Sequence, residues 1–216
     1  MPDDIARHID HTLLRPDSTR SDIDLLCQEA RQYHFAAVCV PPTYVKRAVQ
    51  QLDQTDIAIA TVVGFPLGYT SRAAKRYETS DALAKGATEI DMVINIGAVK
   101  DRRWHFLQRE IRSLTAEAHR QKALIKVIIE TALLSPDEIV SLCDICAYCH
   151  ADFVKTSTGF SHAGADVATV QLMRNVLPDS VRIKAAGGIR TREFALSLIN
   201  TGADRLGCSQ SVAICQ

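Results

Sequence analysis

Two lysines lie inside apolar runs of the sequence, Lys155 in FVKTSTGF and Lys184 in RIKAAGGIR. Both runs resemble short buried strands, and both lead into turns that contain glycine. Burial and a nearby like charge each lower the pKa of an ammonium group towards the neutral amine, which attacks carbonyl carbons. The pair therefore predicts covalent carbonyl chemistry, without showing which lysine is the nucleophile. For each lysine, an outward position beside a carboxylate is the structural alternative.

A carboxylate in a third apolar run is the candidate proton carrier. Asp91 in TEIDMVINIGA needs a buried partner, which Lys184 or Lys126 could supply. There it could move protons to and from a carbinolamine, directly or through water. The alternative is a structural ion pair in the wall of the fold. Glu89 and Asn95 share its place in the strand alternation, so the pattern does not choose among the three.

Further polar residues lie in other apolar runs. Lys126 and Glu130 share one face of LIKVIIET, where they complete a polar network or form a structural ion pair. Asp10 and Thr12 in HIDHTLL belong to the same category, whereas Cys39 in VCV is typical of a core position. Three histidines could be functional, although such residues more often support a site or lie at the surface: His8, His11 and His162.

Three glycine-containing turns suit an anion. They are Thr158-Gly159, Gly187-Gly188 and Gly207-Cys208-Ser209. In many barrels the loops after the last two strands bind phosphate through backbone N–H groups and a helix N-terminus. Glycine permits the close approach that such binding needs. The turns predict a phosphate-bearing substrate, with plain tight turns as the alternative.

Three cysteines recur every third residue from Cys143 to Cys149, a spacing that resembles a metal motif. The surrounding SPDEIVSLCDICAYCHAD instead favours an amphipathic helix, with Ser135 as its cap and Pro136 in its first position. There the cysteines would pack as small apolar side chains. No further CxxC occurs elsewhere to complete a four-thiolate site. We expect no metal and no other cofactor, and stoichiometric zinc or iron in the purified protein would contradict this.

Eight repeats of one pattern carry these residues: a short β-branched run followed by an amphipathic stretch. The predicted strands cover residues 8–14, 35–40, 57–65, 88–95, 124–131, 152–158, 181–188 and 204–209. Predicted helices include 21–33, 42–52, 71–86 and 106–121, with candidate caps at Ser21, Thr43, Ser71 and Ser135. Gly86 and Gly202 fit the ends of helices.

Eight such cycles predict the α/β class and a single (β/α)₈ TIM barrel over residues 1–216, with an abbreviated C-terminal helix. An open, doubly wound sheet is the alternative. Charged residues inside the strands favour the barrel, because its inner surface near the mouth can hold them. The last unit, SVAICQ, is too short for a full helix. Either the barrel closes imperfectly or a second subunit covers the gap, so a homodimer and a homotetramer both remain open.

Composition narrows the class of partner. Acidic and basic residues balance to a formal net charge of zero, and no basic block is present, which argues against nucleic acid. No apolar stretch reaches the length of a membrane span, and the acidic start of the chain does not resemble a signal peptide. The seven cysteines fit reduced thiols. We therefore expect a cytoplasmic protein that acts on a small molecule.

The motifs together resemble the 2-deoxyribose-5-phosphate aldolase family, class I aldolases on a (β/α)₈ barrel. The similarity runs from end to end through IDHTLL, AAVCVPPTYV, VVGFPLG, ATEIDMVINIGA, LIKVIIET, FVKTSTGF, IKAAGGIR and RLGCS. The resemblance implies reversible cleavage of 2-deoxy-D-ribose 5-phosphate to acetaldehyde and D-glyceraldehyde 3-phosphate, without a metal. Another phosphosugar enzyme, and a silent binding barrel with the same loops, are the competing hypotheses.

The resemblance also implies roles for individual residues. Lys155 would form the Schiff base, Lys184 would lower its pKa and assist proton transfer, and Asp91 would be the acid–base partner. Residues that match the family's phosphate loops are Thr158, Gly159, Gly187, Gly188 and Ser209. Residues that match further pocket positions are Asp10, Cys39 and Lys126.

Two positions depart from the family pattern. Ala186 stands where a serine is usual, and Gln210 replaces a hydroxyl in the loop after the eighth strand. The C-terminal tail, which closes over the substrate in some members, is also short. Each substitution alters a possible phosphate contact, so we expect weaker selection for phosphate than is usual in the family.

Overall fold

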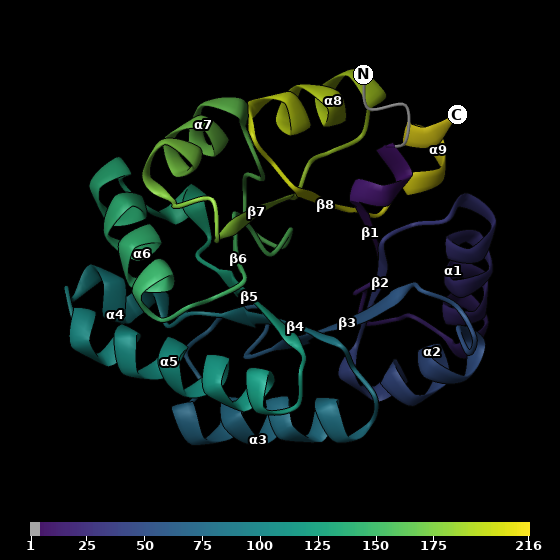
Figure 1. The fold of residues 1–216 in the computed structure, drawn as a ribbon, viewed down its shortest axis with the longest axis horizontal. Coiled ribbons are helices and arrows are strands. Elements are labelled where there is room, and N and C mark those ends of the chain that lie inside the picture. The colour runs from purple at the N-terminus through teal and green to yellow at the C-terminus, as the bar shows by residue number, and fades with distance from the viewer. Residues whose placement is uncertain (1–4) are drawn as a thin grey trace.

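Eight parallel strands close into a barrel with helices around it (Figure 1). The computed structural model describes residues 5–216, so the expectation for the acidic residues at the start of the chain lies largely outside it. The strands are β1 (Ile9–Thr12), β2 (Ala37–Val40), β3 (Ala58–Val63), β4 (Glu89–Val93), β5 (Leu124–Ile128), β6 (Phe153–Lys155), β7 (Arg182–Ala186) and β8 (Arg205–Cys208). Each strand pairs with its sequence neighbours, and β8 pairs with β1. The barrel prediction is confirmed, and the open-sheet alternative is wrong.

Amphipathic helices cover the outside of the barrel. The helices are α1 (Arg20–Tyr33), α2 (Val45–Gln51), α3 (Arg72–Ala84), α4 (Ile96–Lys100), α5 (Trp104–Arg120), α6 (Pro136–Tyr148), α7 (Val167–Val176), α8 (Arg192–Thr201) and α9 (Ser211–Cys215). Short 3₁₀ turns are η1 (Ile5–His8), η2 (Pro42–Tyr44) and η3 (Thr131–Leu133). Buried aliphatic residues from strands and helices form one continuous apolar layer between them. No helix in residues 5–216 combines the length and apolar character that crossing a bilayer requires.

Two of the four predicted caps are confirmed. The side chains of Ser71 and Ser135 accept hydrogen bonds at the starts of α3 and α6. Ser21 is wrong as a cap, because Thr19, two residues earlier, is the cap and forms a reciprocal capping box with Asp22. Thr43 is also wrong, because it lies inside η2, which begins without a side-chain cap.

The strands are shorter than predicted because the chain turns before each apolar run ends. After β3 the chain leaves the sheet at Gly64, whose φ of +62° favours glycine, and continues through a cis Phe65–Pro66 bond. After β4, Asn95 accepts a hydrogen bond from Ala98 N as the cap of α4. Asn95 therefore leaves the strand alternation that it was predicted to share with Asp91.

The last unit is abbreviated, as predicted, yet the barrel closes. β8 pairs directly with β1, with His11 in register with Cys208. The five-residue α9 packs against η1, α1 and α8, beside the N-terminal end of the chain (Figure 1). The expectation of imperfect closure is therefore wrong.

The cysteine triplet lies on α6 and just beyond its end. Cys143 and Cys146 are fully buried in the apolar layer, and burial raises the pKa of the Cys143 thiol to about 12. Cys149 is also buried, with its thiol 3.4 Å from the carbonyl oxygen of Gln108. These positions agree with the prediction of packing residues.

A buried ion pair between α3 and α5 braces the end of β4. Lys75 Nζ lies 2.9 Å from Glu110 Oε1 and donates to Val93 O at 2.8 Å, and both side chains are fully buried. Glu110 also accepts from Asn95 N at 3.2 Å. The pair thus fixes the point at which β4, the strand that carries Asp91, leaves the sheet.

We expect Lys75→Met to lower the free energy of unfolding by about 3–5 kcal/mol, because it leaves a buried carboxylate without its cation. Burial raises the pKa of Glu110 despite Lys75. A carboxyl group whose pKa is raised on folding stabilises the protein below its unfolded pKa, and that contribution is lost as the pH rises through the folded pKa. Removal of Lys75 raises the pKa of Glu110 further, because Lys75 opposes the effect of burial. The loss of stability should therefore be larger at about pH 8 than at about pH 5. Urea unfolding at both pH values measures it.

The matched control is Lys100→Met, which breaks the exposed Lys100–Glu138 pair on the surface. That change should cost less than about 1 kcal/mol. Equal losses in the two variants would contradict a bracing role for the buried pair.

Candidate active site

The two strand lysines point into the barrel and meet at one carboxylate. Lys155 on β6 and Lys184 on β7 are register neighbours. Their amines donate to the same oxygen, Asp91 Oδ2, at 2.8 and 2.7 Å. Lys155 is 2% exposed and Lys184 is fully buried. The outward alternative is wrong for both, and the amines lie within several ångströms of each other.

Below these groups, charges of alternating sign fill the barrel interior. Lys126 on β5 donates to Asp91 Oδ1 at 2.8 Å and contacts Glu89. Asp10 on β1 accepts from Lys184 and from Arg205 on β8. Arg205 also reaches Glu89 at 3.4 Å. Every buried charge named here thus has an opposite charge in contact, which offsets the cost of desolvation.

The network makes the two lysines electrostatically unequal. Burial, aided by Lys184, lowers the pKa of Lys155 although Asp91 opposes the shift. Burial acts on Lys184 in the same direction, but Asp10 and Asp91 together raise its pKa above the ordinary value. Burial would raise the pKa of Asp91, but Lys126, Lys155 and Lys184 together hold it well below its usual range. The network therefore shifts Lys155 towards the neutral amine and Lys184 towards the cation.

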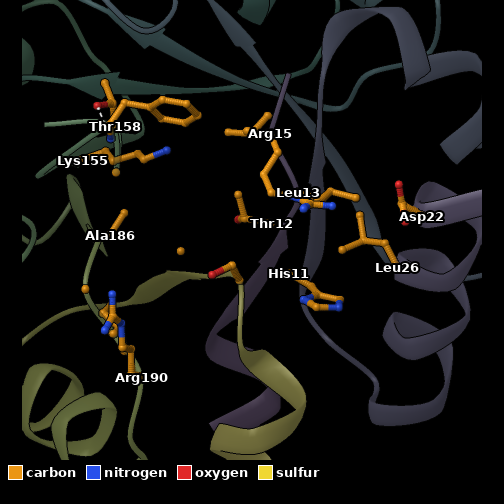
Figure 2. A pocket seen from close by; sticks show the side chains of 18 of the residues that line it. His11, Thr12, Leu13, Arg15, Asp22, Leu26, Lys155, Thr158, Ala186 and Arg190 are labelled. Atoms are coloured by element: carbon orange, nitrogen blue, oxygen red, sulfur yellow. Dashed lines mark hydrogen bonds between the residues drawn. The ribbon is translucent and has the colours of Figure 1, made fainter. Parts of the chain in front are cut away.

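A cavity of about 570 Å³ opens above Lys155 at the C-terminal mouth of the barrel. Figure 2 shows Lys155, Thr158 and Ala186 on one side of it, with Thr12 and Arg15 opposite. Predicted site residues that line the cavity are Lys155, Thr158, Gly159, Gly187, Gly188 and Ser209. Those that lie outside its lining, within the barrel, are Asp91, Lys184, Lys126, Asp10 and Cys39.

Cys39 is fully buried beside Ala60 and Val62, with Leu14 and Phe65 packed against this group. Burial raises the pKa of its thiol to about 11. The thiol therefore stays neutral near physiological pH, as its interpretation as a core residue requires.

Glu130 does not join Lys126, contrary to the prediction from strand alternation. It lies beyond the end of β5 with a φ of 56°, so its side chain no longer follows the strand pattern. Instead it accepts hydrogen bonds from both the backbone N and the hydroxyl of Thr158. The Thr158 hydroxyl accepts from Phe160 N at 3.1 Å, which shapes the turn after β6.

The turn after β7 depends on glycine. Gly187 has a φ of +87° and Gly188 a φ of +75°, a region that other residues rarely adopt. Gly164 packs so closely that a Cβ there would lie 2.2 Å from Gly187 O. Ala165 N donates to the same oxygen at 3.1 Å. These contacts hold the turn rigidly at the edge of the cavity.

Two arginines that line the cavity were not predicted from the sequence. Arg15 follows β1 and Arg190 follows the Gly187-Gly188 turn, and both are exposed. Figure 2 shows them entering the cavity region from different sides. Each could have been recognised as a cation that comes just after a predicted strand or a glycine turn. The rings of Phe65 and Phe160 pack edge to face, with their centroids 5.2 Å apart. This contact connects the loop after β3 to the loop after β6.

Residues 5–216 contain no group of three or more His, Cys, Asp or Glu side chains placed to hold a metal ion. Asp91 and Asp10 are instead engaged by lysine and arginine. The arrangement places a lysine amine, a neighbouring cation and a carboxylate below a mouth that glycine turns and two arginines line.

Comparison with known proteins points to one family. The family model described as DeoC/LacD family aldolase matches residues 5–213. A Bacillus mycoides protein named deoxyribose-phosphate aldolase is 50% identical over 210 residues, which cover 97% of this chain and 94% of the relative. A Bacillus licheniformis protein named deoxyribose-phosphate aldolase 1 is 49% identical, with coverage of 99% and 96%.

Solved structures agree. A putative deoxyribose-phosphate aldolase from Coccidioides immitis superposes with a TM-score of 0.96 at 42% identity, covering 100% of this chain and 85% of that one. A deoxyribose phosphate aldolase from Aeropyrum pernix, described as a unique tetrameric structure, gives 0.93 at 32% identity, with coverage of 100% and 91%.

Proposed function

The chain belongs to the DeoC/LacD family of aldolases, and on that premise we propose that it reversibly cleaves 2-deoxy-D-ribose 5-phosphate to acetaldehyde and D-glyceraldehyde 3-phosphate. The observation that carries the proposal is the convergence of Lys155 and Lys184 on Asp91 beneath the cavity. Lys155 is the nucleophile, because it alone of the three lines the cavity and its pKa is lowered.

The first half of the reaction builds an electron sink. The neutral Lys155 amine attacks C1 of the open-chain sugar to form a carbinolamine, which loses water to form a protonated imine. Asp91 and Lys184 carry the protons that this dehydration requires, since both lie within hydrogen-bonding reach of the reacting amine or of its partner oxygen. No metal is needed, because the iminium accepts the electrons.

Cleavage then breaks the C2–C3 bond. As the C3 hydroxyl loses its proton, the electron pair of that bond moves into the iminium and leaves an enamine of the two-carbon fragment. The three-carbon fragment departs as an aldehyde that keeps the phosphate. Protonation of the enamine at C2 and hydrolysis of the resulting imine release acetaldehyde and restore Lys155.

The mouth of the cavity supplies the site for the phosphate. Gly159, Gly187 and Gly188 present backbone at the cavity, and Ser209 lines it in the turn after β8. Arg190 and Arg15 add two cations to the lining of the cavity. These cations attract the negative charge of a phosphomonoester to the mouth of the barrel.

The proposal is tested by incubating the purified protein with 2-deoxy-D-ribose 5-phosphate and measuring acetaldehyde and D-glyceraldehyde 3-phosphate. Equimolar release of the two products is the expected result. An isomerase would instead give a five-carbon product, and a silent binding barrel would give none, so either outcome would overturn the proposal.

The same assay tests phosphate selection. Gln210 precedes α9, and its amide side chain offers no hydroxyl to the phosphate. We expect Gln210→Ser to widen the kcat/KM ratio between phosphorylated and unphosphorylated deoxyribose by roughly three- to tenfold, the value of one added hydrogen bond. An unchanged ratio would refute weak selection at this turn.

The proposal extends to the cellular compartment, the domain organisation and the oligomeric state. We place the reaction in the cytoplasm, supported by seven cysteines that carry no disulfide in the structure. The whole chain, 1–216, acts as one aldolase domain. A homodimer or homotetramer is the proposed assembly, supported by the tetrameric description of the Aeropyrum pernix relative.

A further inference from the structure

The seam where β8 closes on β1 holds a hydrogen-bonded chain that the carbonyl chemistry does not use. His11 follows Asp10 on β1, so its side chain points out of the barrel. The ring is 4% exposed and lies 5.0 Å from the ring of Phe35. Nε2 lies 2.6 Å from Glu29 Oε2 on α1, and Nδ1 lies 2.9 Å from Ser211 Oγ on α9.

This chain ends on the turn that borders the cavity. The fully buried Ser211 hydroxyl donates to Cys208 O at 3.1 Å. Between these two residues the backbone passes through Ser209, which lines the cavity. His11 and Glu29 also line it, and Figure 2 shows His11 on the side that faces α1. The contacts thus tie α1 and β1 to the 207–209 turn.

The contacts of this chain admit two arrangements of hydrogen atoms that differ by one proton on the ring. In both of them Nε2–H donates to Glu29 Oε2 at 2.6 Å. With a proton also on Nδ1, the ring donates to Ser211 Oγ, and the Ser211 hydroxyl donates to Cys208 O.

Loss of that proton changes both charge and bonding. Nε2–H would remain on Glu29, Nδ1 would become an acceptor, and the Ser211 hydroxyl would turn to it from Cys208 O. The cavity wall would gain one negative charge and the turn would lose one hydrogen bond. Burial lowers the pKa of His11 below its usual value, against the effect of Glu29, which favours loss of the proton as the pH rises.

Few other groups near the ring titrate. Glu29 faces it from α1, and Cys208 lies beside it on β8 with a thiol pKa that burial raises to about 12. Ser211 on α9 and Phe35 before β2 carry no charge. The His11–Glu29 pair is therefore the local proton site.

We propose that His11 is a positioning residue for the 207–209 turn, and that a proton on its ring, which Glu29 contacts, strengthens the turn's binding of the substrate phosphomonoester. The inference rests on the proposed function. Its consequence is specificity: the pair acts on the phosphate end of the substrate and leaves the chemistry at Lys155 unchanged.

The test compares kcat and KM for 2-deoxyribose 5-phosphate and for 2-deoxyribose between about pH 5 and about pH 8. We expect Ser211→Ala to raise KM for the phosphorylated sugar roughly five- to tenfold at the acidic end, with kcat and the other KM within about twofold. Glu29→Gln should remove the wild-type rise of KM with pH. Titration of the substrate phosphate affects KM of the wild type and of Glu29→Gln equally, so the difference between their two pH profiles reports the protein alone.

Ser197→Ala is the matched control, because it removes a serine-to-carbonyl hydrogen bond of 2.7 Å on α8 and is not among the residues that line the cavity. Its KM values should stay at those of the wild type. Equal effects of Ser211→Ala on both sugars, or a wild-type KM profile in Glu29→Gln, would overturn the inference.

Binding of sn-glycerol 3-phosphate, measured by calorimetry, separates this inference from the proposed function, since that ligand has no carbonyl. Weaker binding to Ser211→Ala than to the wild type would support the role of the turn even if no acetaldehyde were released from the sugar. Equal affinities of the two proteins would overturn it even if the aldolase activity is present.

Discussion

Replacing Lys155 by leucine should lower kcat for cleavage of 2-deoxyribose 5-phosphate by at least about 10⁴-fold, as loss of the nucleophile does in other covalent enzymes. No second amine can take over, because Lys184 is fully buried outside the cavity lining and its pKa is raised by Asp10 and Asp91. Initial rates at saturating substrate measure the loss.

The Lys155→Leu protein should still fold. Asp91 keeps Lys126 at 2.8 Å and Lys184 at 2.7 Å, so its buried charge stays neutralised. Circular dichroism and a urea titration check this point, with Lys100→Leu as a surface control that should retain full activity. Substantial turnover by a folded Lys155→Leu protein would refute the mechanism.

Asp91→Asn should lower kcat by about 10²- to 10⁴-fold, the usual contribution of a positioned acid–base group. The change also removes the influence that raises the pKa of Lys155, so the amine stays neutral and can still attack the carbonyl. Dehydration of the carbinolamine, for which Asp91 carries protons, should slow, so formation of the covalent adduct should fall together with turnover. Single-turnover rates, measured beside steady-state rates, compare the two.

Glu89→Gln is the matched control for Asp91→Asn. Glu89 is a carboxylate of the same network that contacts Lys126 and Arg205 but is not among the contacts of Lys155. Both variants leave buried cations short of a partner and should cost about 3–5 kcal/mol of stability. Similar losses of kcat in the two variants would show that Asp91 acts through stability rather than proton transfer.

The central geometry of the site could be predicted from the sequence. Lys155 and Lys184 each stand inside an apolar strand shortly before a glycine turn, and parallel pairing places such positions side by side. Strand alternation could not place Glu130, because the backbone turns to a positive φ just beyond β5. Asn95 failed for a different reason, since it lies beyond the end of β4 and caps the helix that begins there.

The difference between the lysines could not be predicted from their own strands. It depends on Asp10, which lies 174 residues before Lys184 and reaches it only because β1 closes the barrel beside β8. Arg205 and Glu89 meet across the same interior. Such contacts follow from closure and stagger of the barrel rather than from any local pattern.

Borohydride trapping with acetaldehyde, followed by peptide mass mapping, tests the central claim most directly. The reaction of the amine with acetaldehyde forms the imine of the proposed cycle, and reduction fixes it as an ethyl group on the lysine nitrogen. We expect one ethyl group, located on Lys155 and absent from the Lys155→Leu protein. An ethyl group on Lys184 instead, or no adduct at all, would contradict the account.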